Sequence, residues 1–320
     1  MNPKANSINL SAFLVTGASG FIGRHLVSRL LIEYPEVRVV AQYRGDLPAA
    51  FDERVVPLKS ELSELPVVLK RHASLPKWYS GVFHLAAFTP KSTKDDNAIK
   101  AVETNILGTY YLLQAVTGLT DRLVFTSAID VYSPRSLNET ILEDSPIAGQ
   151  TLYAASKIFG ETLVQKWRPG NMERVAIVRM GHIYGPGEDA YKKLIPETIR
   201  RLLSGQPALL FGNGDDLRDF LYVADAAEGL VFAWRALAHG DIGPVNLVSG
   251  QSLTVRDVIG IICEAASAPG FIEQRPGTAL PRSLRFDASR AKKEIGFRAK
   301  TPFQEGIRSE IEWFRKKGSS

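Results

Sequence analysis

Short apolar runs alternate with segments of helical periodicity through the first 180 residues. Buried strands are predicted from their continuous apolar or β-branched composition at residues 13–15, 37–41, 54–56, 81–85, 123–127 and 175–179. Helices are predicted at 98–116, at 152–167 and directly after residue 23, where Leu26, Val27, Leu30 and Leu31 share one face. This alternation is typical of a doubly wound parallel sheet covered by helices.

After residue 180 the regular alternation weakens. Glycine-rich loops are expected at 181–187 and 205–214, and further elements at 223–238, 245–248, 254–266, 289–295 and 303–317. We therefore predict a first domain over residues 1–180 and a smaller substrate-binding domain over 181–320. The helix and strand within 223–248 are expected to return to the first domain.

A glycine-rich turn separates the first predicted strand from the first predicted helix. Residues 16–23 read Thr-Gly-Ala-Ser-Gly-Phe-Ile-Gly. In this context Gly17 permits a tight turn, Gly20 lets the backbone approach a pyrophosphate, and Gly23 lets the helix pack closely on the strand. The helix N-terminus favours negative charge, so the turn predicts a dinucleotide site. A purely structural turn is the alternative.

The end of the second predicted strand bears on which dinucleotide binds. An acidic residue there would bind the ribose 2′-hydroxyl of NAD, but the chain reads Ala-Gln-Tyr-Arg over 41–44, with no acid before Asp46. Arg44 can instead pair with the 2′-phosphate of NADP. NADP is therefore favoured and NAD stays possible, since Arg44 can also be a plain surface residue.

Tyr153 and Lys157 lie four residues apart and so share one face of the predicted helix 152–167. A free tyrosine has a pKa of about 10, and a neighbouring ammonium lowers that pKa by favouring the phenolate. The pair therefore predicts a proton donor and acceptor that works near neutral pH. The same spacing also occurs by chance on helices without chemistry.

Composition excludes several classes of function. The net charge of +5 and pI near 9.2 suit an anionic small ligand as well as a solvated basic surface. No basic run with interleaved aromatic residues indicates nucleic acid. Cys263 is the one cysteine, and the five histidines show no metal-ligand spacing. Residues 1–10 are polar and no apolar run is long enough to span a bilayer, so we expect a cytoplasmic protein without membrane contact.

Together the motifs resemble those of the extended short-chain dehydrogenase/reductases, the NAD(P)-dependent epimerase/dehydratase family that acts on nucleotide sugars. The glycine turn and Tyr153-x-x-x-Lys157 carry this resemblance. Further matches, in the family's order, lie at residues 82–87, 105–109, 179–186, 193–196 and 218–225. The resemblance covers nearly the whole chain and implies a Rossmann-like sheet with a smaller C-terminal domain.

The resemblance also implies roles for individual residues. Those implied to bind the cofactor are Gly17, Ser19, Gly20, Phe21, Ile22, Gly23, Arg44, Glu61, Leu62, Leu85, Ala86, Ala87 and Asn105. Lys157 would bind the nicotinamide ribose and Tyr153 would be the catalytic acid and base. Arg218 and Arg275 would clamp the substrate diphosphate through bidentate contacts, unless they form surface salt bridges.

One departure from the family pattern concerns catalysis. The family usually has Ser or Thr four residues before the tyrosine at Tyr132, where this chain has Ala128. Ser127 is the neighbouring hydroxyl that could replace it, although strand alternation points Ser127 to the opposite face. Relatives that dehydrate dTDP-glucose have Asp-Glu next, and the pair Ile129-Asp130 found here counts against dehydration.

Other departures concern the substrate. His182 replaces the asparagine of the family's loop, and would either donate to a substrate phosphate or simply pack. Asp130 and Lys193 would form a second acid/base pair for epimerisation beside a carbonyl. Alternatively, Lys193 contacts the nucleotide and Asp130 a sugar hydroxyl.

The sequence thus predicts NADP-dependent reduction or epimerisation of a nucleotide-diphosphate sugar at carbon 4. The run 193–196 favours a dTDP-sugar, and the family implies a homodimer through helices 98–116 and 152–167. Two alternatives stay open. One is an enzyme that reduces a non-nucleotide carbonyl. The other is a binding protein whose chemistry has decayed, for which Ala128 is the evidence.

Overall fold

The computed structural model describes residues 11–45, 52–90, 97–133, 139–167, 174–277 and 284–318. Its centre is a seven-stranded parallel sheet in the order β11-β7-β5-β4-β1-β2-β3. The strands are β1 (Ala12–Thr16), β2 (Arg38–Tyr43), β3 (Val55–Lys59), β4 (Gly81–His84), β5 (Arg122–Ala128), β7 (Arg174–Met180) and β11 (Ile242–Leu247). The Rossmann-like doubly wound sheet predicted from the sequence is therefore confirmed.

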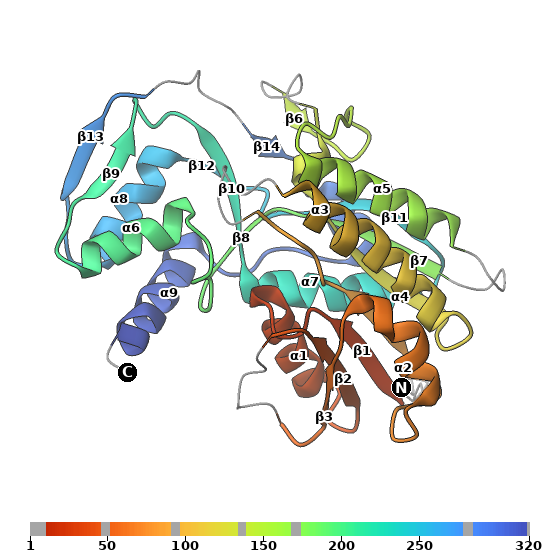
Figure 1. The fold of residues 1–320 in the computed structure, drawn as a ribbon. Coiled ribbons are helices and arrows are strands. Elements are labelled where there is room, and N and C mark those ends of the chain that lie inside the picture. Colours follow the sequence, from red (N-terminus) through yellow and green to blue (C-terminus); the bar gives the residue numbers. More distant parts are fainter. Residues whose placement is uncertain are drawn as a thin grey trace, which may run out of the picture.

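Helices cover both faces of this sheet because the strands are apolar on both sides (Figure 1). On one face, Phe13 and Val15 of β1 pack with α1 (Phe21–Glu33) and α7 (Val223–Ala236). On the other face, Leu14 packs with α2 (Leu65–Arg71), α4 (Gly108–Val116) and α5 (Leu152–Lys166). Strand alternation thus divides one apolar run between two cores.

The predicted helix 98–116 is continuous but not uniform. It starts as α3 (Ala98–Lys100), widens into a π-helical segment at Ala101–Leu107, and continues as α4. Such π-segments are frequent at functional sites. Asn105 lies within this one and is buried.

A smaller lobe follows β7 and lies to the left in Figure 1. Its helices α6 (Leu194–Leu203), α8 (Val255–Ala265) and α9 (Phe303–Gly318) share one apolar core. Its short strands are β8 (His182–Tyr184), β9 (Ala208–Phe211), β10 (Leu217–Tyr222), β12 (Ser252–Thr254) and β13 (Ile272–Arg275). Two further short strands, β6 (Thr140–Ile141) and β14 (Arg285–Phe286), pair with each other.

Strands β8 and β9 lie within segments that the sequence predicts as loops. Each has only three or four residues and is stabilised by a partner distant in sequence: β8 pairs with β10, and β9 pairs with β13. The predicted helix at 289–295 is confirmed, and most of it is a π-helical turn at Ala291–Ile295.

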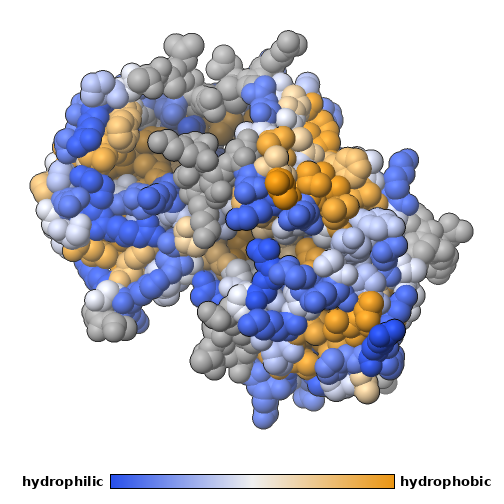
Figure 2. Space-filling model, viewed as in Figure 1, coloured by the Kyte–Doolittle hydropathy of each residue, from blue (hydrophilic) through white to orange (hydrophobic). Residues whose placement is uncertain are grey.

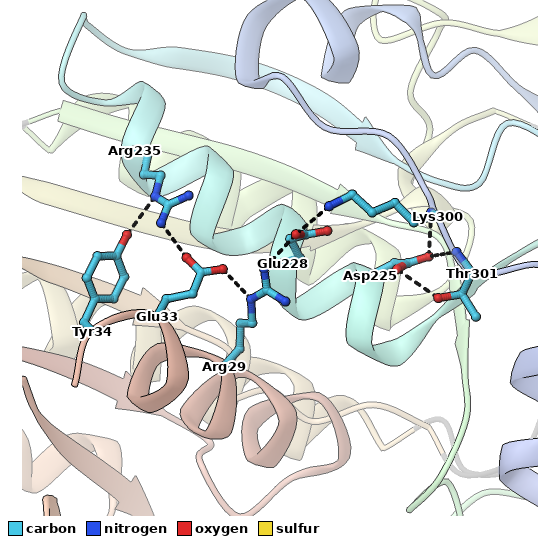
Figure 3. A network of polar contacts seen from close by, with 8 residues as sticks. All are labelled: Arg29, Glu33, Tyr34, Asp225, Glu228, Arg235, Lys300 and Thr301. Atoms are coloured by element: carbon cyan, nitrogen blue, oxygen red, sulfur yellow. Dashed lines mark hydrogen bonds and ion pairs between the residues drawn. The ribbon is translucent and has the colours of Figure 1, made fainter. Parts of the chain in front are cut away.

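A polar network ties the outer helices to the segment that leads into α9 (Figure 3). The buried Glu228 of α7 pairs with Arg29 of α1 at 2.7 Å and with Lys300 at 2.8 Å. Asp225 accepts hydrogen bonds from the backbone N–H groups of Lys300 and Thr301. These contacts fix the start of α9 against the sheet domain.

Candidate functional site

A cleft of about 1090 Å³ lies at the carboxyl ends of the central strands and extends to the smaller lobe. This is where parallel α/β sheets bind ligands. The residues proposed from the sequence that line it are Gly17, Ser19, Gly20, Phe21, Ile22, Gly23, Arg44, Glu61, Leu62, Leu85, Ala86, Ala87, Ser127, Asp130, Tyr153, Lys157, His182 and Lys193. Asn105, Arg218 and Arg275 are not part of its wall.

The glycine turn has the geometry of a phosphate cradle. Gly17 has a φ of +70°, and a Cβ on it would lie 2.7 Å from the Ala86 nitrogen. A Cβ on Gly23 would lie 2.2 Å from the Gly17 carbonyl oxygen, so α1 packs directly on the turn. Among the described residues, no side chain caps α1 at Gly20 and no acidic residue lies in its first turn. Its free N–H groups therefore fit the pyrophosphate of a dinucleotide.

Gln42 braces this turn, a role that sequence reasoning missed. It is buried; its Oε1 accepts a hydrogen bond from the Gly17 N–H at 3.1 Å, and its Nε2 donates to the Ser60 carbonyl at 2.6 Å. The side chain thus joins the ends of three neighbouring strands. Only its position at the end of the strand that follows the glycine turn and the first helix could have suggested this.

Arg44 follows Gln42 and Tyr43 on the cleft wall, while Asp46 lies outside the described residues. The Arg44 side chain is 61% exposed, and its Nη1 lies 4.0 Å from Glu61 Oε2. Glu61 itself begins a helical turn in a capping box with Glu64. The guanidinium is therefore accessible to an anion at the edge of the cleft, with one carboxylate beside it.

Tyr153 and Lys157 both face the cleft from α5, which Thr151 caps by accepting a hydrogen bond from the Ala154 N–H. Lys157 Nζ donates to the Thr126 carbonyl at 2.9 Å and lies 6.0 Å from the centre of the Tyr153 ring. Burial lowers the pKa of Lys157 to about 8. The ammonium is thereby held between β5 and the tyrosine.

The pKa of Tyr153 departs from the sequence-based expectation. Burial raises it, the Asp130 carboxylate raises it further, and a hydrogen bond with Thr89 opposes them. Loss of hydration of the phenolate is the largest cause, and the lowering expected from Lys157 is not among the causes of this shift. Tyr153 is therefore a neutral hydroxyl, the form that can donate a proton.

Ser127 and Ala128 are consecutive residues at the end of β5, but their side chains make different contacts. The buried Ser127 hydroxyl donates to Glu161 Oε1 at 2.5 Å, and Glu161 also pairs with Arg179 at 2.9 Å. The proposal that Ser127 replaces the missing hydroxyl is not supported by this geometry, because that hydroxyl is committed to a buried charge. Ala128 contributes a methyl group to the cleft wall.

Asn105 has an indirect place in the site. Its Oδ1 accepts from the Phe88 N–H at 2.7 Å, and its Nδ2 donates to the Phe88 carbonyl at 3.0 Å and to Ser156 Oγ at 2.9 Å. The side chain therefore joins the loop after β4 to α5. Asn105 is not part of the cleft wall and holds protein backbone, and the cofactor contact inferred for it stays a prediction.

The substrate side of the cleft holds Asp130, His182 and Lys193. His182 Nδ1 lies 3.3 Å from the Asp219 carbonyl oxygen. Burial lowers the pKa of His182, the Asp130 charge opposes this, and the Arg218 and Lys193 charges lower it further. Lys193 Nζ donates to the buried Glu188 at 2.8 Å. His182 therefore lies near one negative group, Asp130, and near the positive groups of Arg218 and Lys193.

The two arginines inferred to clamp a diphosphate lie outside the wall of the cleft. Arg218, on β10 beside the β8 strand of His182, donates to the Leu217 carbonyl at 2.8 Å and to Asp216 at 3.1 Å. Arg275 ends β13, has a side chain that is 48% exposed, and pairs with Glu273. Neither guanidinium lines the cleft as formed by the described residues, and the diphosphate clamp inferred from the family stays a prediction.

Known proteins are similar to this chain over most of its length. The family model described as "NAD dependent epimerase/dehydratase family" matches residues 13–247. A dTDP-glucose 4,6-dehydratase of Actinoplanes sp. is 30% identical over 324 residues, covering 94% of this chain and 97% of that protein. The structure of MoeE5 in complex with UDP-glucose and NAD has a TM-score of 0.81 at 28% identity, covering 96% and 99% of the two chains.

One similar protein is much longer than this chain. A trifunctional UDP-glucose 4,6-dehydratase, epimerase and reductase of Arabidopsis thaliana is 28% identical over 94% of this chain, which spans only 46% of its length. Within the described residues, no cluster of three or more His, Cys, Asp or Glu is arranged to hold a metal ion. No described helix combines the length and apolarity needed to cross a membrane.

Proposed function

Because the chain belongs to the NAD-dependent epimerase/dehydratase family, we propose that it is a ketoreductase or epimerase of a nucleotide-diphosphate sugar, acting at carbon 4. The observation that carries this proposal is the shared cleft. Tyr153 and Lys157 line the same space as the glycine turn at the N-terminus of α1. A dinucleotide held by the turn would bring its nicotinamide to the tyrosine.

The proposed roles follow from the chemistry of each group. When bound, the nicotinamide cofactor exchanges a hydride with the sugar carbon. The N-terminus of α1 holds the pyrophosphate and Lys157 holds the nicotinamide ribose. Tyr153 gives its phenolic proton to the sugar oxygen as the carbonyl becomes an alcohol, and takes a proton back in the reverse direction. An epimerase uses both directions in turn.

The cofactor proposed is NADP. Arg44 supports it, since an exposed guanidinium at the cleft edge can pair with a 2′-phosphate. NAD is the competing cofactor, because MoeE5 is described with NAD and because Glu61 would repel a phosphate next to Arg44.

The substrate proposed carries a diphosphate and a base. The positive groups near His182 favour an anion, and the run 193–196 favours a dTDP-sugar. A UDP-sugar is the competing substrate, since MoeE5 is described with UDP-glucose. Ile129 in place of an acid argues against dehydration.

A homodimer is also proposed. Exposed apolar side chains lie on α3 and α5 and on the π-segment between α3 and α4, in an apolar area at the upper right of Figure 2. They include Ile99 at 69%, Val102 at 46%, Leu152 at 46% and Phe159 at 49% exposure. Apolar patches of this kind mark interaction sites. Light scattering of the wild type and of Phe159→Glu tests this surface: a monomeric variant from a dimeric wild type is expected.

A second candidate function rests on the methyl group of Ala128. It leaves the reacting oxygen without its usual partner, which favours either a reductase of simpler carbonyl compounds or a binding protein without turnover. Ligands retained after gentle purification, identified by mass spectrometry, distinguish these: a sugar nucleotide together with NADP or NAD supports the proposal.

Turnover of Tyr153→Phe tests the mechanism. The variant should lose roughly 10²–10⁴-fold in kcat while keeping its cofactor affinity, because only the proton donor is removed. Tyr79→Phe is the matched control, since Tyr79 is buried away from the cleft and its hydroxyl has no partner among the described residues. Unchanged turnover in Tyr153→Phe would exclude the mechanism. Cofactor binding without turnover on keto-sugars or simple ketones would support the binding protein.

A further inference from the structure

Because position 128 is alanine, it offers no hydroxyl to donate a hydrogen bond to the substrate oxygen beside Tyr153. The adjacent hydroxyls on β5 cannot donate that hydrogen bond in its place. Ser127 donates to Glu161, and Thr126 Oγ1 donates to the His84 carbonyl at 2.9 Å. Both protons are therefore directed away from the cleft into buried contacts.

Thr89 is a hydroxyl that reaches the tyrosine from another element. It lines the cleft in the loop after β4, together with Ala128, Tyr153 and Tyr191. The Thr89 side chain is close enough to Tyr153 and Tyr191 in this wall to oppose, by hydrogen bonding, the rise that burial causes in the pKa of each tyrosine. Because Thr89 and Tyr153 lie close together on the cleft wall, a carbonyl oxygen that accepts a hydrogen bond from Tyr153 would also be within reach of the Thr89 hydroxyl.

The backbone around Thr89 is fixed on both sides. Asn105 holds the N–H and the carbonyl of Phe88 at 2.7 and 3.0 Å, and its third hydrogen bond reaches Ser156, next to Lys157 on α5. On the other side, Pro90 restricts the backbone of the residue before it to extended conformations. Thr89 is thus positioned relative to the helix that carries Tyr153.

We propose that Thr89 is a further catalytic residue and that Asn105 is its positioning residue. This inference rests on the proposed function. As the carbonyl carbon gains the hydride, the π pair moves to the oxygen and the Tyr153 proton forms the new O–H bond. Thr89 keeps its own proton and donates a hydrogen bond to that oxygen, which stabilises the developing charge. The chain would thereby replace the lost strand hydroxyl with one from the neighbouring loop.

Substitutions at positions 89 and 128 test whether the Thr89 hydroxyl replaces the hydroxyl absent from position 128. Thr89→Val removes the hydroxyl at nearly constant shape and should lower kcat roughly 10²-fold, with the cofactor Kd within about twofold. Thr89→Ser should retain most of the rate. Adding Ala128→Ser to Thr89→Val should recover about tenfold or more, because a hydroxyl returns to the same oxygen from the strand. Thr140→Val on the exposed strand β6 is the matched control and should leave kcat unchanged.

A double-mutant cycle tests Asn105. Asn105→Asp keeps the acceptor for the Phe88 N–H and loses the two donated hydrogen bonds. If Asn105 acts through Thr89, its effect on kcat should largely vanish in the Thr89→Val background. A general structural role would instead give the same loss in both backgrounds, together with weaker cofactor binding, and would overturn the positioning role.

The results of these experiments distinguish a failure of this inference from a failure of the proposed function. An active wild type that tolerates Thr89→Val, while Tyr153→Phe is inactive, overturns the role of Thr89 alone. A wild type that binds cofactor and turns over neither nucleotide sugars nor simple ketones overturns both.

Discussion

The Ser127 hydroxyl donates to the Glu161 carboxylate at 2.5 Å, and both residues are buried, Ser127 on β5 and Glu161 on α5. Glu161 also receives two hydrogen bonds from Arg179 of β7, at 3.0 and 2.9 Å. The residue nearest to the expected catalytic position therefore stabilises a buried ion pair below the site. Its neighbour Ala128 also lines the cleft and brings only a methyl group there.

Ser127→Ala should affect stability more than catalysis. A hydrogen bond to a buried charged group contributes about 1.5–3 kcal/mol, and Arg179 remains to compensate Glu161. We expect the free energy of unfolding to fall by about 1–2 kcal/mol while kcat changes less than about threefold. Denaturant unfolding and initial rates measure the two, and the exposed Ser204→Ala is the control. A large loss of kcat at unchanged stability would restore Ser127 as a catalytic residue.

Arg44→Ala should weaken NADP binding selectively. Loss of a charge-assisted contact costs about 1.5–3 kcal/mol, or roughly tenfold or more in Kd, whereas NAD has no 2′-phosphate to lose. Titration of both cofactors against wild type, Arg44→Ala and the control Arg38→Ala measures this. Glu61→Gln should tighten NADP, because the carboxylate beside the guanidinium is removed. Equal affinities of the wild type for both cofactors would contradict the proposal.

Arg218→Ala should raise the KM for a nucleotide sugar without changing cofactor affinity. The Arg218 charge lowers the pKa of His182, so its removal should raise that pKa and move the pH dependence of KM upward. Measuring KM across pH for wild type and variant tests both effects. Arg275→Ala should have the smaller effect, since its exposed side chain pairs with Glu273. If KM and cofactor Kd rise together, Arg218 supports the fold rather than the ligand.

Glu310 should make the protein less stable as the pH rises. The residue is fully buried in α9, and its carboxylate oxygens have no hydrogen-bond partner among the described residues. Burial raises its pKa from 4.5 to about 9, and the Glu188 charge contributes. Between these values the folded protein holds a proton that the unfolded chain has lost. The free energy of unfolding should therefore fall by up to about 1.4 kcal/mol per pH unit over that range and level off above it.

Glu310→Gln should remove this pH dependence, because an amide of the same shape does not ionise. Denaturant unfolding of wild type and variant at a series of pH values measures the difference in slope. Glu305→Gln, exposed in the first turn of the same helix, is the matched control. Identical slopes in wild type and Glu310→Gln would show that Glu310 ionises normally in the folded state.

The sequence by itself determined the features that depend on residues close together in the chain. Apolar runs identify the central strands, helical spacing identifies α1 and α5, and the glycines of 16–23 identify the turn between β1 and α1. The facing of Tyr153 and Lys157 follows from one helical turn. These patterns are local, because steric and conformational preferences act over a few residues.

Only the tertiary structure decided which distant groups meet. Ser127 forms a hydrogen bond with Glu161, which is 34 positions away in the sequence. Asn105 forms one with Ser156, which is 51 positions away. The pairing of β8 with β10 and the place of Thr89 beside Tyr153 depend in the same way on packing between elements. A hydrogen-bond donor has many chemically equivalent acceptors along a chain, and only the fold selects one of them. The sequence therefore located the glycine turn and the proposed proton donor, while packing selected the hydroxyl that lies beside that donor.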